Sequence, residues 1–270
     1  MSDASNVQAV DDYWGRDGLS QTILDTLAAT GKDLDALTIE DLTPLDQYHF
    51  GGKGATMSLA HLAALTPGLR VLDVGGGLGG PARMLAVEFG CNVTVVDLTE
   101  SYVLAAKELT SRLRLGDQVE HQIGDALELS FDDGAFDVVW TQNSGMCISA
   151  KERLYAGFHR VLRPGGLLAF QEPMAGPMQP PIFPLMWARD ATTNFLRTPV
   201  EMRALIEAAG FRTHAWDDVT MEPAQPDAAD PAHSLRYLVM GDELAAISPA
   251  QLRNRDEGRI VMVQGIFNRP

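Results

Sequence analysis

The fold is decided by one glycine-rich stretch, Arg70-Val-Leu-Asp-Val-Gly-Gly-Gly-Leu-Gly-Gly80. Its first half is a short apolar run, typical of a parallel strand that is buried on both faces. Glycines follow, and Pro81 then opens a helical pattern, where a proline suits the first turn. Because glycine lets the backbone turn sharply and lets a ligand approach with no Cβ in the way, the stretch predicts a cradle for a nucleotide-type ligand.

The glycines fit two patterns. Positions 75, 77 and 80 spell G-x-G-x-x-G, the dinucleotide fingerprint. Asp73 with Gly75, Gly77 and Gly79 spells D-x-G-x-G-x-G, which resembles motif I of the methyltransferases that depend on S-adenosylmethionine (SAM). A structural loop without a ligand is a third interpretation. The glycines leave these interpretations open, so the rest of the chain has to decide.

Composition narrows the class of protein. The 270 residues suffice for one good-sized domain, or for one domain with a cap. A net charge of −15 argues against a nucleic-acid partner, which needs a basic face to neutralise phosphates. No apolar run approaches the roughly 18 residues that cross a bilayer, and the polar N-terminus lacks the order of a signal peptide, so no membrane association is expected. Two cysteines form no disulfide framework, and a cytoplasmic location is expected.

Strand and helix patterns alternate from residue 55 to the C-terminus. Strands are expected at 71–74, 91–97, 119–125, 137–141, 167–171, 211–219 and 260–267. Helices are expected at 55–65, from 81 onward, and at 101–113, 151–162 and 199–209. This alternation predicts an α/β fold with a doubly wound parallel sheet.

The N-terminal segment is expected to be a helical lid, residues 1–55, placed on a main domain of residues 56–270. It carries the aromatic pair Tyr13-Trp14, and the run Gln47-Tyr48-His49 leads into two glycines. Aromatic residues and a histidine beside flexible glycines are typical of a lid over a site. The alternative is a capping helix whose aromatic side chains simply pack on the main domain.

Cap insertions are expected near 173–199 and 220–258. The first is rich in proline and methionine, so it cannot form one continuous helix. An apolar, irregular segment after the fifth strand is typical of a substrate-pocket wall, for which Met174, Phe183 and Trp187 are the candidate residues. A hydrophobic packing patch or a homodimer contact is the alternative.

Further motifs decide between the patterns of glycines. Asp97 ends the second expected strand, Gly124-Asp125-Ala126 ends the third, and Phe136-Asp-Val-Val-Trp140 and Leu162-Arg-Pro-Gly-Gly166 follow. With the glycine stretch, this series resembles the class I SAM-dependent methyltransferases over residues 68–172. It is most similar to the small-molecule branch with sarcosine/dimethylglycine and phosphoethanolamine N-methyltransferases. The resemblance implies a Rossmann-like seven-stranded sheet in the order 3-2-1-4-5-7-6, with strand seven antiparallel.

The resemblance also implies SAM as cofactor, with S-adenosylhomocysteine (SAH) as product. Asp97 lies 20 residues past Gly77, the spacing of an acid that accepts hydrogen bonds from ribose hydroxyls. Leu98 is expected to pack on the adenine, while Asp125 and the Ala126 N–H are expected to bind its polar edge. The full set of expected cofactor-binding residues is Gln47, Asp73, Gly75, Gly76, Gly77, Asp97, Leu98, Gly124, Asp125, Ala126, Gln142 and Asn143.

The implied activity is methyl transfer to a small molecule, most of all to an amine nitrogen as in the sarcosine/dimethylglycine enzymes. Transfer to oxygen, sulfur or carbon is the alternative, and a SAM-binding regulatory module without turnover is an alternative of another class. His49 and Glu172 are the candidate catalytic residues, with His49 expected to orient the substrate more than to take a proton. Tyr13, Trp14 and Tyr48 join the candidate substrate contacts, and no residue group has the spacing of metal ligands.

Overall fold

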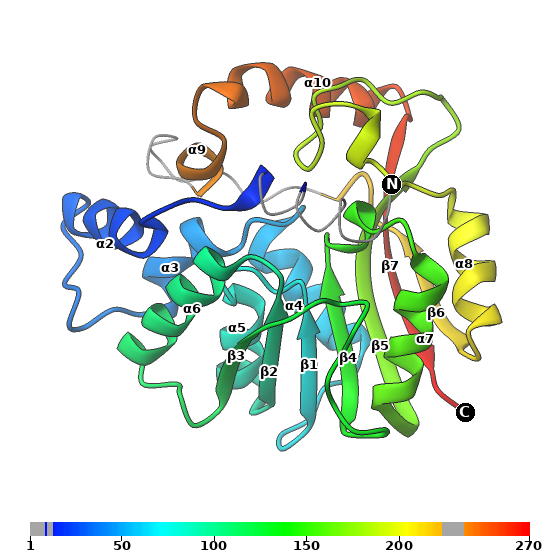
Figure 1. The fold of residues 1–270 in the computed structure, drawn as a ribbon, viewed down its shortest axis with the longest axis horizontal. Helices are drawn as coiled ribbons and strands as arrows, with labels where there is room; N and C mark the ends of the chain where they lie inside the picture. The colour runs from blue at the N-terminus through cyan, green and yellow to red at the C-terminus, as the bar shows by residue number, and fades with distance from the viewer. Residues whose placement is uncertain (1–8, 10–12, 223–234) are drawn as a thin grey trace.

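The computed structural model describes Ala9, residues 13–222 and residues 235–270. In this part of the chain one sheet is formed, in spatial order, by β3 (Val119–Ile123), β2 (Asn92–Asp97), β1 (Arg70–Val74), β4 (Phe136–Gln142), β5 (Leu162–Ala175), β7 (Ile260–Asn268) and β6 (Arg212–Asp218) (Figure 1). Strands β1 to β5 pair in parallel, and β7 is antiparallel to both β5 and β6. The expected strand order and the antiparallel last strand are confirmed.

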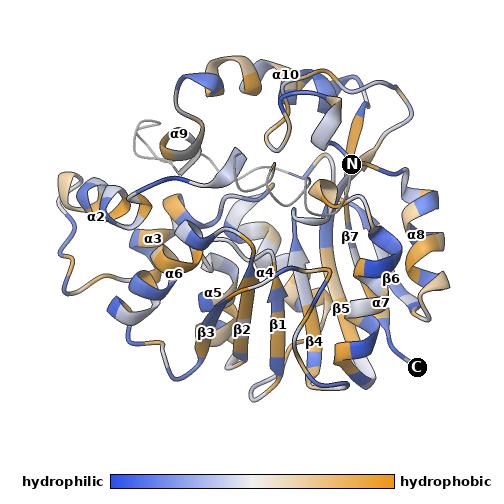
Figure 2. Cartoon of the chain, viewed as in Figure 1, coloured by the Kyte–Doolittle hydropathy of each residue, from blue (hydrophilic) through white to orange (hydrophobic). Residues whose placement is uncertain are grey.

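Helices cover both faces of this sheet, which explains the apolar strands. Successive side chains of a strand point to opposite faces. Val71 and Val138 therefore pack with α4 (Gly52–Leu62) and α5 (Gly80–Phe89). Their neighbours Leu72 and Val139 pack on the other face, with α7 (Lys151–Val161) and α8 (Pro199–Ala208). In Figure 2 the apolar colour runs through the strands, as expected when both faces are buried.

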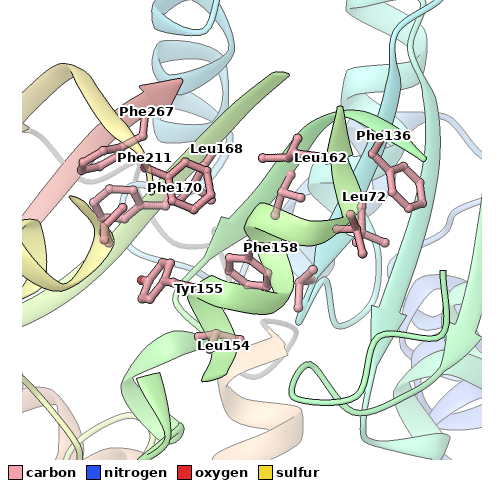
Figure 3. Close-up of a cluster of buried hydrophobic side chains, with 14 of the residues drawn as sticks. Leu72, Phe136, Leu154, Tyr155, Phe158, Leu162, Leu168, Phe170, Phe211 and Phe267 are labelled. Atoms are coloured by element: carbon pink, nitrogen blue, oxygen red, sulfur yellow. The ribbon is translucent and has the colours of Figure 1, made fainter. Parts of the chain in front are cut away.

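The core on the second face is built largely of aromatic and leucine side chains. Helix α7 directs Leu154, Tyr155 and Phe158 toward the sheet, where they join Leu168 and Phe170 of β5 (Figure 3). Each of these residues is at most 2% exposed. Full burial of one such side chain contributes roughly 1.5–3 kcal/mol, so this cluster stabilises the packing of α7 on the sheet.

Strand β5 is longer at both ends than the sequence patterns indicate. It includes the Arg163–Gly166 turn that the pattern places before it, and it continues to Ala175. Pro173 and Met174 pair with Met262 and Val261 of β7, so the segment expected to be cap from residue 173 begins as strand. An antiparallel partner extends the strand here, because β7 supplies a hydrogen-bonding edge that no local pattern in β5 announces.

The carboxyl ends of the strands lie beneath a layer of helices and loops. It comprises α2 (Leu19–Ala29), α3 (Ile39–Asp46), α9 (Leu235–Met240), α10 (Leu244–Asp256) and the loop of residues 176–198, with α9 and α10 across the top in Figure 1. Ile23 and Leu42 of the N-terminal helices pack with Met240 and Ile247. The N-terminal helices and α9–α10 therefore share one apolar cluster.

Parts of the expected lid and cap lie outside the described residues. These parts are residues 1–8 and 10–12 of the lid and residues 223–234 of the second insertion.

The remaining helix of the main domain, α6 (Glu100–Arg112), lies where the sequence pattern places it and packs against α2 and β3.

Helix α3 begins with a side-chain cap. Thr38 and Asp41 form a capping box, in which each side chain accepts a hydrogen bond from the backbone N–H of the other residue. Among the residues that the structure describes, no helix combines the length and the apolar character needed to span a membrane.

Candidate functional site

A cavity of about 270 Å³ opens at the carboxyl ends of the strands. Its glycine end, over β1, β2 and β3, is lined by Asp73–Leu78, Val96–Thr99 and Gly124–Leu127. Its cap end, over β5 and β7, is lined by Met146–Ile148, Pro173, Leu185–Trp187, Thr220, Gln251, Asn254, Arg255 and Ile260–Met262. Ligands of open α/β sheets bind at this edge, where the strand order reverses.

The glycine turn after β1 leaves no room for side chains at two positions. A Cβ on Gly75 would clash with the Ser144 Cβ, 2.4 Å away, and one on Gly76 would lie 2.6 Å from Asp73 Oδ2. Gly77 differs, because a Cβ there would meet only Tyr102 at 3.7 Å, but its φ of +54° favours glycine. The turn thus requires glycine for close packing at the first two positions and for backbone conformation at the third.

The Asp97 carboxylate, at the end of β2, holds this turn in place. Its Oδ2 accepts a hydrogen bond from the Gly77 N–H at 2.9 Å, and its Oδ1 accepts one from the Thr99 N–H at 2.9 Å. Burial raises the pKa of Asp97, while these two N–H groups lower it. Since a carboxylate has about four lone-pair sites, Asp97 keeps acceptor capacity for a ligand after both bonds.

Asp73 is a buried acid with an unused oxygen. Its side chain lines the cavity, and Oδ2 has no hydrogen-bond partner in the described part of the chain. Burial and the nearby charge of Asp97 raise the pKa of Asp73 to about 8. The Tyr102 hydroxyl, also in the lining, is likewise buried without a partner among the described residues. A buried polar atom without a partner is costly, so these groups fit a polar ligand that can hydrogen-bond to them.

The other expected residues of the glycine end lie together as the resemblance implied. Leu98, Gly124, Asp125 and Ala126 all line the cavity. The Asp125 Oδ1 accepts from the Leu127 N–H at 2.8 Å, which fixes the turn after β3. The strand ends of β2 and β3 therefore bring Leu98 and Asp125 to one wall.

His49 lies in a hydrogen-bonded network that occupies both ring nitrogens. Its Nδ1 is 3.2 Å from the Phe50 carbonyl oxygen, and its Nε2 is 3.0 Å from both Gln47 Oε1 and Thr56 Oγ1. Burial lowers the pKa of His49 to about 4, so the imidazole is neutral at pH 7. The ring lines the cavity, but Gln47 and Thr56 occupy Nε2, so this nitrogen is not open to accept a proton from a substrate.

The same network joins the N-terminal segment to β4. The Thr56 hydroxyl donates to Gln142 Oε1 at 3.1 Å, and Trp140 Nε1 donates to the same oxygen at 3.0 Å. The amide nitrogens of Gln47 and Gln142 are buried without partners in the described residues. No sequence pattern pointed to Thr56 or to the role of Trp140, because a threonine in a helix and a tryptophan in a strand carry no functional signal by themselves.

Glu172 is buried behind the cavity wall and does not line it. Its Oε1 accepts from the N–H groups of Gly145 at 2.9 Å and Ser144 at 3.2 Å, and burial raises its pKa. Lys151 Nζ donates to the Gly145 carbonyl at 2.7 Å, and burial lowers the pKa of Lys151 to about 8. Together they brace the loop of residues 144–148. Lys151 carries no signal in the sequence, where it resembles a solvated residue at a helix start.

The candidate substrate residues divide into two groups. Trp14, Tyr48 and Trp187 line the cavity, whereas Tyr13, Met174 and Phe183 do not. The Tyr13 hydroxyl, with its pKa raised by burial to about 12, donates to the backbone carbonyls of Leu185 at 3.3 Å and Met186 at 3.2 Å. Met174 packs in the core with α7 and α8, and Phe183 packs against the cluster around Met146 and Trp187.

The remaining expected cofactor residues flank the network of His49. Gln142 and Asn143 line the cavity after β4, while Gln47 lies behind His49 and is absent from the lining. Asn143 has a φ of +55°, and its N–H donates to the Gln171 carbonyl at 2.9 Å. Gln47 was expected to contact the cofactor directly. In the structure it does not reach the cavity, and its amide oxygen is hydrogen-bonded to the His49 ring.

A buried ion pair fastens the N-terminal segment to the glycine cradle. Arg83 Nη2 of α5 donates to Asp46 Oδ2 at 2.7 Å, and both side chains are at most 3% exposed. Arg83 Nη1 donates to Thr110 Oγ1 at 3.0 Å, which in turn lies 2.8 Å from His121 Nε2. Burial lowers the pKa of His121 to about 3. Asp46 lines the cavity, and its pairing could not be found from the sequence because the two residues are far apart in the chain.

Metal binding has no support in the part of the chain that the structure describes. There, no group of three or more His, Cys, Asp or Glu residues is arranged to hold an ion.

Residues 72–170 match a family model described as a methyltransferase domain. Sterol 24-C-methyltransferase of Eremothecium gossypii is 40% identical over 114 residues, 42% of this chain and 31% of the relative. Sarcosine/dimethylglycine N-methyltransferase of Halorhodospira halochloris is 35% identical over 166 residues, 58% of this chain and 56% of the relative. The chain thus spans between about a third and just over half of these relatives.

Solved structures extend the likeness of the fold to the whole chain. Geranyl diphosphate C-methyltransferase from Streptomyces coelicolor superposes with a TM-score of 0.74, at 17% sequence identity, over 100% of both chains. At this identity the superposition establishes the fold alone.

Proposed function

We propose that this chain, whose residues 72–170 form a class I SAM-dependent methyltransferase domain, is an enzyme that transfers a methyl group from SAM to a small molecule. The observation that carries the proposal is the set of polar groups with unused hydrogen-bonding capacity at the glycine end and beside it, after β4. Asp97 has spare acceptor sites, Asp73 Oδ2 is buried without a partner among the described residues, and the Gln142 amide nitrogen is a buried donor without one there. SAM carries ribose hydroxyls, an ammonium and a carboxylate, which complement these groups in kind.

The residues of this chain that would hold SAM follow from that complementarity. Asp97 would accept from the ribose hydroxyls, and Leu98, Asp125 and the Ala126 N–H would contact the adenine. The zwitterionic amino acid portion would lie near Asp73 and the glycine turn, with the Gln142 amide as a donor to its carboxylate. Gln47 and Asn143 would contribute by positioning this wall, since Gln47 lies behind the His49 ring.

Methyl transfer requires few reactive groups from the protein itself. SAM, when bound, supplies a methyl group that its sulfonium already activates. The chain then has to bind the two reactants in line and to exclude water. His49 is proposed to orient the acceptor or its surroundings as a neutral imidazole. Glu172 is proposed as a positioning residue, because it acts on the 144–148 loop and not on the cavity directly.

A pair of variants separates the roles proposed for His49. If it only orients, His49→Gln should retain kcat within about tenfold, because an amide can still hydrogen-bond. If it removes a proton in the rate-limiting step, both His49→Gln and His49→Ala should lose about 10²–10⁴-fold in kcat with unchanged SAM affinity. Equal loss in two well-folded variants would contradict the orienting role.

Residues 1–55 are proposed to act as a lid that orders over the bound cofactor, with residues 176–198 and 220–258 as the rest of the cap. Support comes from Trp14 and Tyr48, which line the cavity with ring centroids 5.8 Å apart. Limited proteolysis within residues 13–50 should be slower with SAH than without it. Equal cleavage rates in both states would contradict ordering by the cofactor.

An amine nitrogen is proposed as the acceptor atom, from the likeness to the sarcosine/dimethylglycine enzyme. A carbon acceptor is the second candidate, favoured by the higher identity to the sterol 24-C-methyltransferase. Single-turnover transfer from methyl-labelled SAM to a panel of amines, phenols and alkenes distinguishes the two by the labelled product. It also tests the regulatory-module alternative, which predicts SAM binding without any labelled product.

The decisive test of the proposal is calorimetric titration of the purified chain with SAM, SAH and NAD. SAM and SAH should bind and NAD should not. Binding of NAD without SAM would overturn the proposal in favour of the dinucleotide interpretation of the same glycines.

A further inference from the structure

The cap end of the cavity has walls of apolar side chains. They come from the loop after β4, from the 176–198 loop and from the start of β7, and include Met146, Leu185, Met186, Trp187, Ile260 and Val261. Methionine and tryptophan side chains at such a wall provide adaptable apolar contact. This end therefore favours a ligand that gains from leaving water.

Two polar side chains at the cap end, Asn254 and Thr220, are already used to hold the cap together. Asn254 of α10 donates to the Ile182 carbonyl at 2.8 Å and accepts from the Ile182 N–H at 2.8 Å. The Thr220 hydroxyl donates to Asp218 Oδ1 and accepts from the Met262 N–H at 2.8 Å. These groups face the cavity but have little hydrogen-bonding capacity left for a ligand.

The charges around the cavity disfavour an anionic ligand group. Arg255 is the one lysine or arginine that the described lining contains, and its Nη2 is paired with Asp256 at 2.7 Å. Four aspartates also line the described cavity, and they offer no cation to an anionic ligand, although Arg83 neutralises Asp46 and burial raises the pKa of Asp73 to about 8. His49 supplies no positive charge, because burial lowers its pKa to about 4. A carboxylate in the cap end would thus find only Arg255, which it would have to share with Asp256.

From these contacts we infer that the methyl acceptor has a largely apolar, uncharged body, which occupies the cap end, and that amino acids and other zwitterions are poor ligands. The inference rests on the proposed function and narrows its acceptor class. It is compatible with a nitrogen acceptor only where the amine belongs to an apolar molecule without a carboxylate.

The test uses the full chain with saturating SAH, so that a probe reports only on the remaining space. N-phenyl-1-naphthylamine, which is neutral and fluoresces in apolar surroundings, serves as the probe. Displacement of the probe is then measured with three competitors that differ in charge: neutral 1-dodecanol, anionic dodecanoate and zwitterionic dimethylglycine. Dodecanol should displace the probe, dodecanoate should compete at least about tenfold more weakly, and dimethylglycine should not compete.

Two variants test whether the probe occupies the cap end. Met186→Arg places a cation in the wall and should weaken probe binding at least about tenfold, while SAH affinity stays unchanged. Met178→Arg is the matched control, because Met178 is 52% exposed and lies outside the lining. Ile260→Arg is a second cavity variant, and melting temperatures show whether each variant is folded.

The outcomes separate this inference from the proposed function. Displacement by dimethylglycine, dodecanoate as strong as dodecanol, or probe binding that Met186→Arg and Ile260→Arg leave unchanged would overturn the apolar acceptor while SAH binding upheld the methyltransferase. Failure of SAH to bind would overturn both. Should the two cavity variants unfold, the competitor series on the unmodified chain decides alone.

Discussion

The two ends of the cavity are built in opposite ways. The glycine end comes from residues 73–127, where successive strands deliver their carboxyl ends to one edge, and it keeps polar atoms open for a ligand. The cap end is assembled from separate segments between residues 146 and 262, and two of its polar side chains, Asn254 and Thr220, are hydrogen-bonded to neighbouring parts of the cap. The features shared with the methyltransferases are thus encoded locally, whereas the shape of the cap end depends on long-range packing.

The largest expected effect comes from breaking the contact between the N-terminal segment and the glycine end. Asp46→Ala leaves Arg83 buried without its partner, which should lower the free energy of unfolding by about 3–5 kcal/mol. Denaturant unfolding measures the loss. The double variant Asp46→Leu with Arg83→Met removes both charges and should recover most of the stability. A single variant that loses less than about 1 kcal/mol would contradict the role of this pair.

The next effect is a pH dependence carried by His49. Its folded pKa, about 4, lies below the usual value of 6.5, so the unfolded chain binds more protons between these pH values. The stability that His49 contributes is therefore fully present above pH 6.5 and falls as the pH drops toward 4, by on the order of 3 kcal/mol. His49→Gln should lack this dependence. The wild type and the variant should thus converge or cross on acidification, and parallel stability curves would refute the prediction.

A third prediction concerns Asp97, whose carboxylate joins β2 to the glycine turn. Asp97→Ala should weaken SAH binding by about 2–3 kcal/mol, roughly 30- to 150-fold, because ribose hydroxyls lose a charged acceptor. Asp133→Ala is the matched control, since this exposed acid pairs with Arg160 outside the cavity lining and should leave the affinity unchanged. Unchanged SAH affinity in the Asp97 variant would remove the ribose assignment.

The smallest effect concerns an exposed ion pair of the cap. Arg189 and Glu243 lie 2.8 Å apart, with side chains 55% and 45% exposed. Solvent screens such a pair, so Arg189→Gln should change the free energy of unfolding by less than about 1 kcal/mol in denaturant titrations. A larger loss would show that the cation contact with the Tyr13 ring, whose centroid lies 5.0 Å from the Arg189 guanidinium carbon, contributes more than the ion pair.

Much of the fold was predictable because it depends on patterns of apolar residues and glycines over a few neighbouring positions. The apolar runs around Val71 and Val95, the glycines after β1 and Asp97 at the expected spacing all lie where the sequence placed them. The resemblance to the methyltransferases and the strand order were confirmed. The extent of β5 was predicted less well, because its partner β7 lies far away in the chain and the pairing of strands depends on such neighbours.

The candidate site was predictable only in part. The resemblance named Asp73, Leu98 and Asp125, which do line the cavity, but the sequence could not show that Glu172 turns toward the 144–148 loop or that Met174 packs in the core. A side chain at the end of a strand has several possible directions, and the neighbours that select one come from other elements. For that reason the candidate list contained both lining and non-lining residues.

By itself, the sequence determined a doubly wound α/β sheet, parallel from β1 to β5, with a glycine cradle and an acid at the end of the second strand. Apolar periodicity and glycine conformations act over a few residues, so their consequences can be derived locally. Only the tertiary structure decided that Asp46 pairs with Arg83, that Thr56 occupies the His49 nitrogen and that the cap end is apolar. These features depend on burial and on hydrogen bonds between distant segments, whose strength arises only once folding has excluded water.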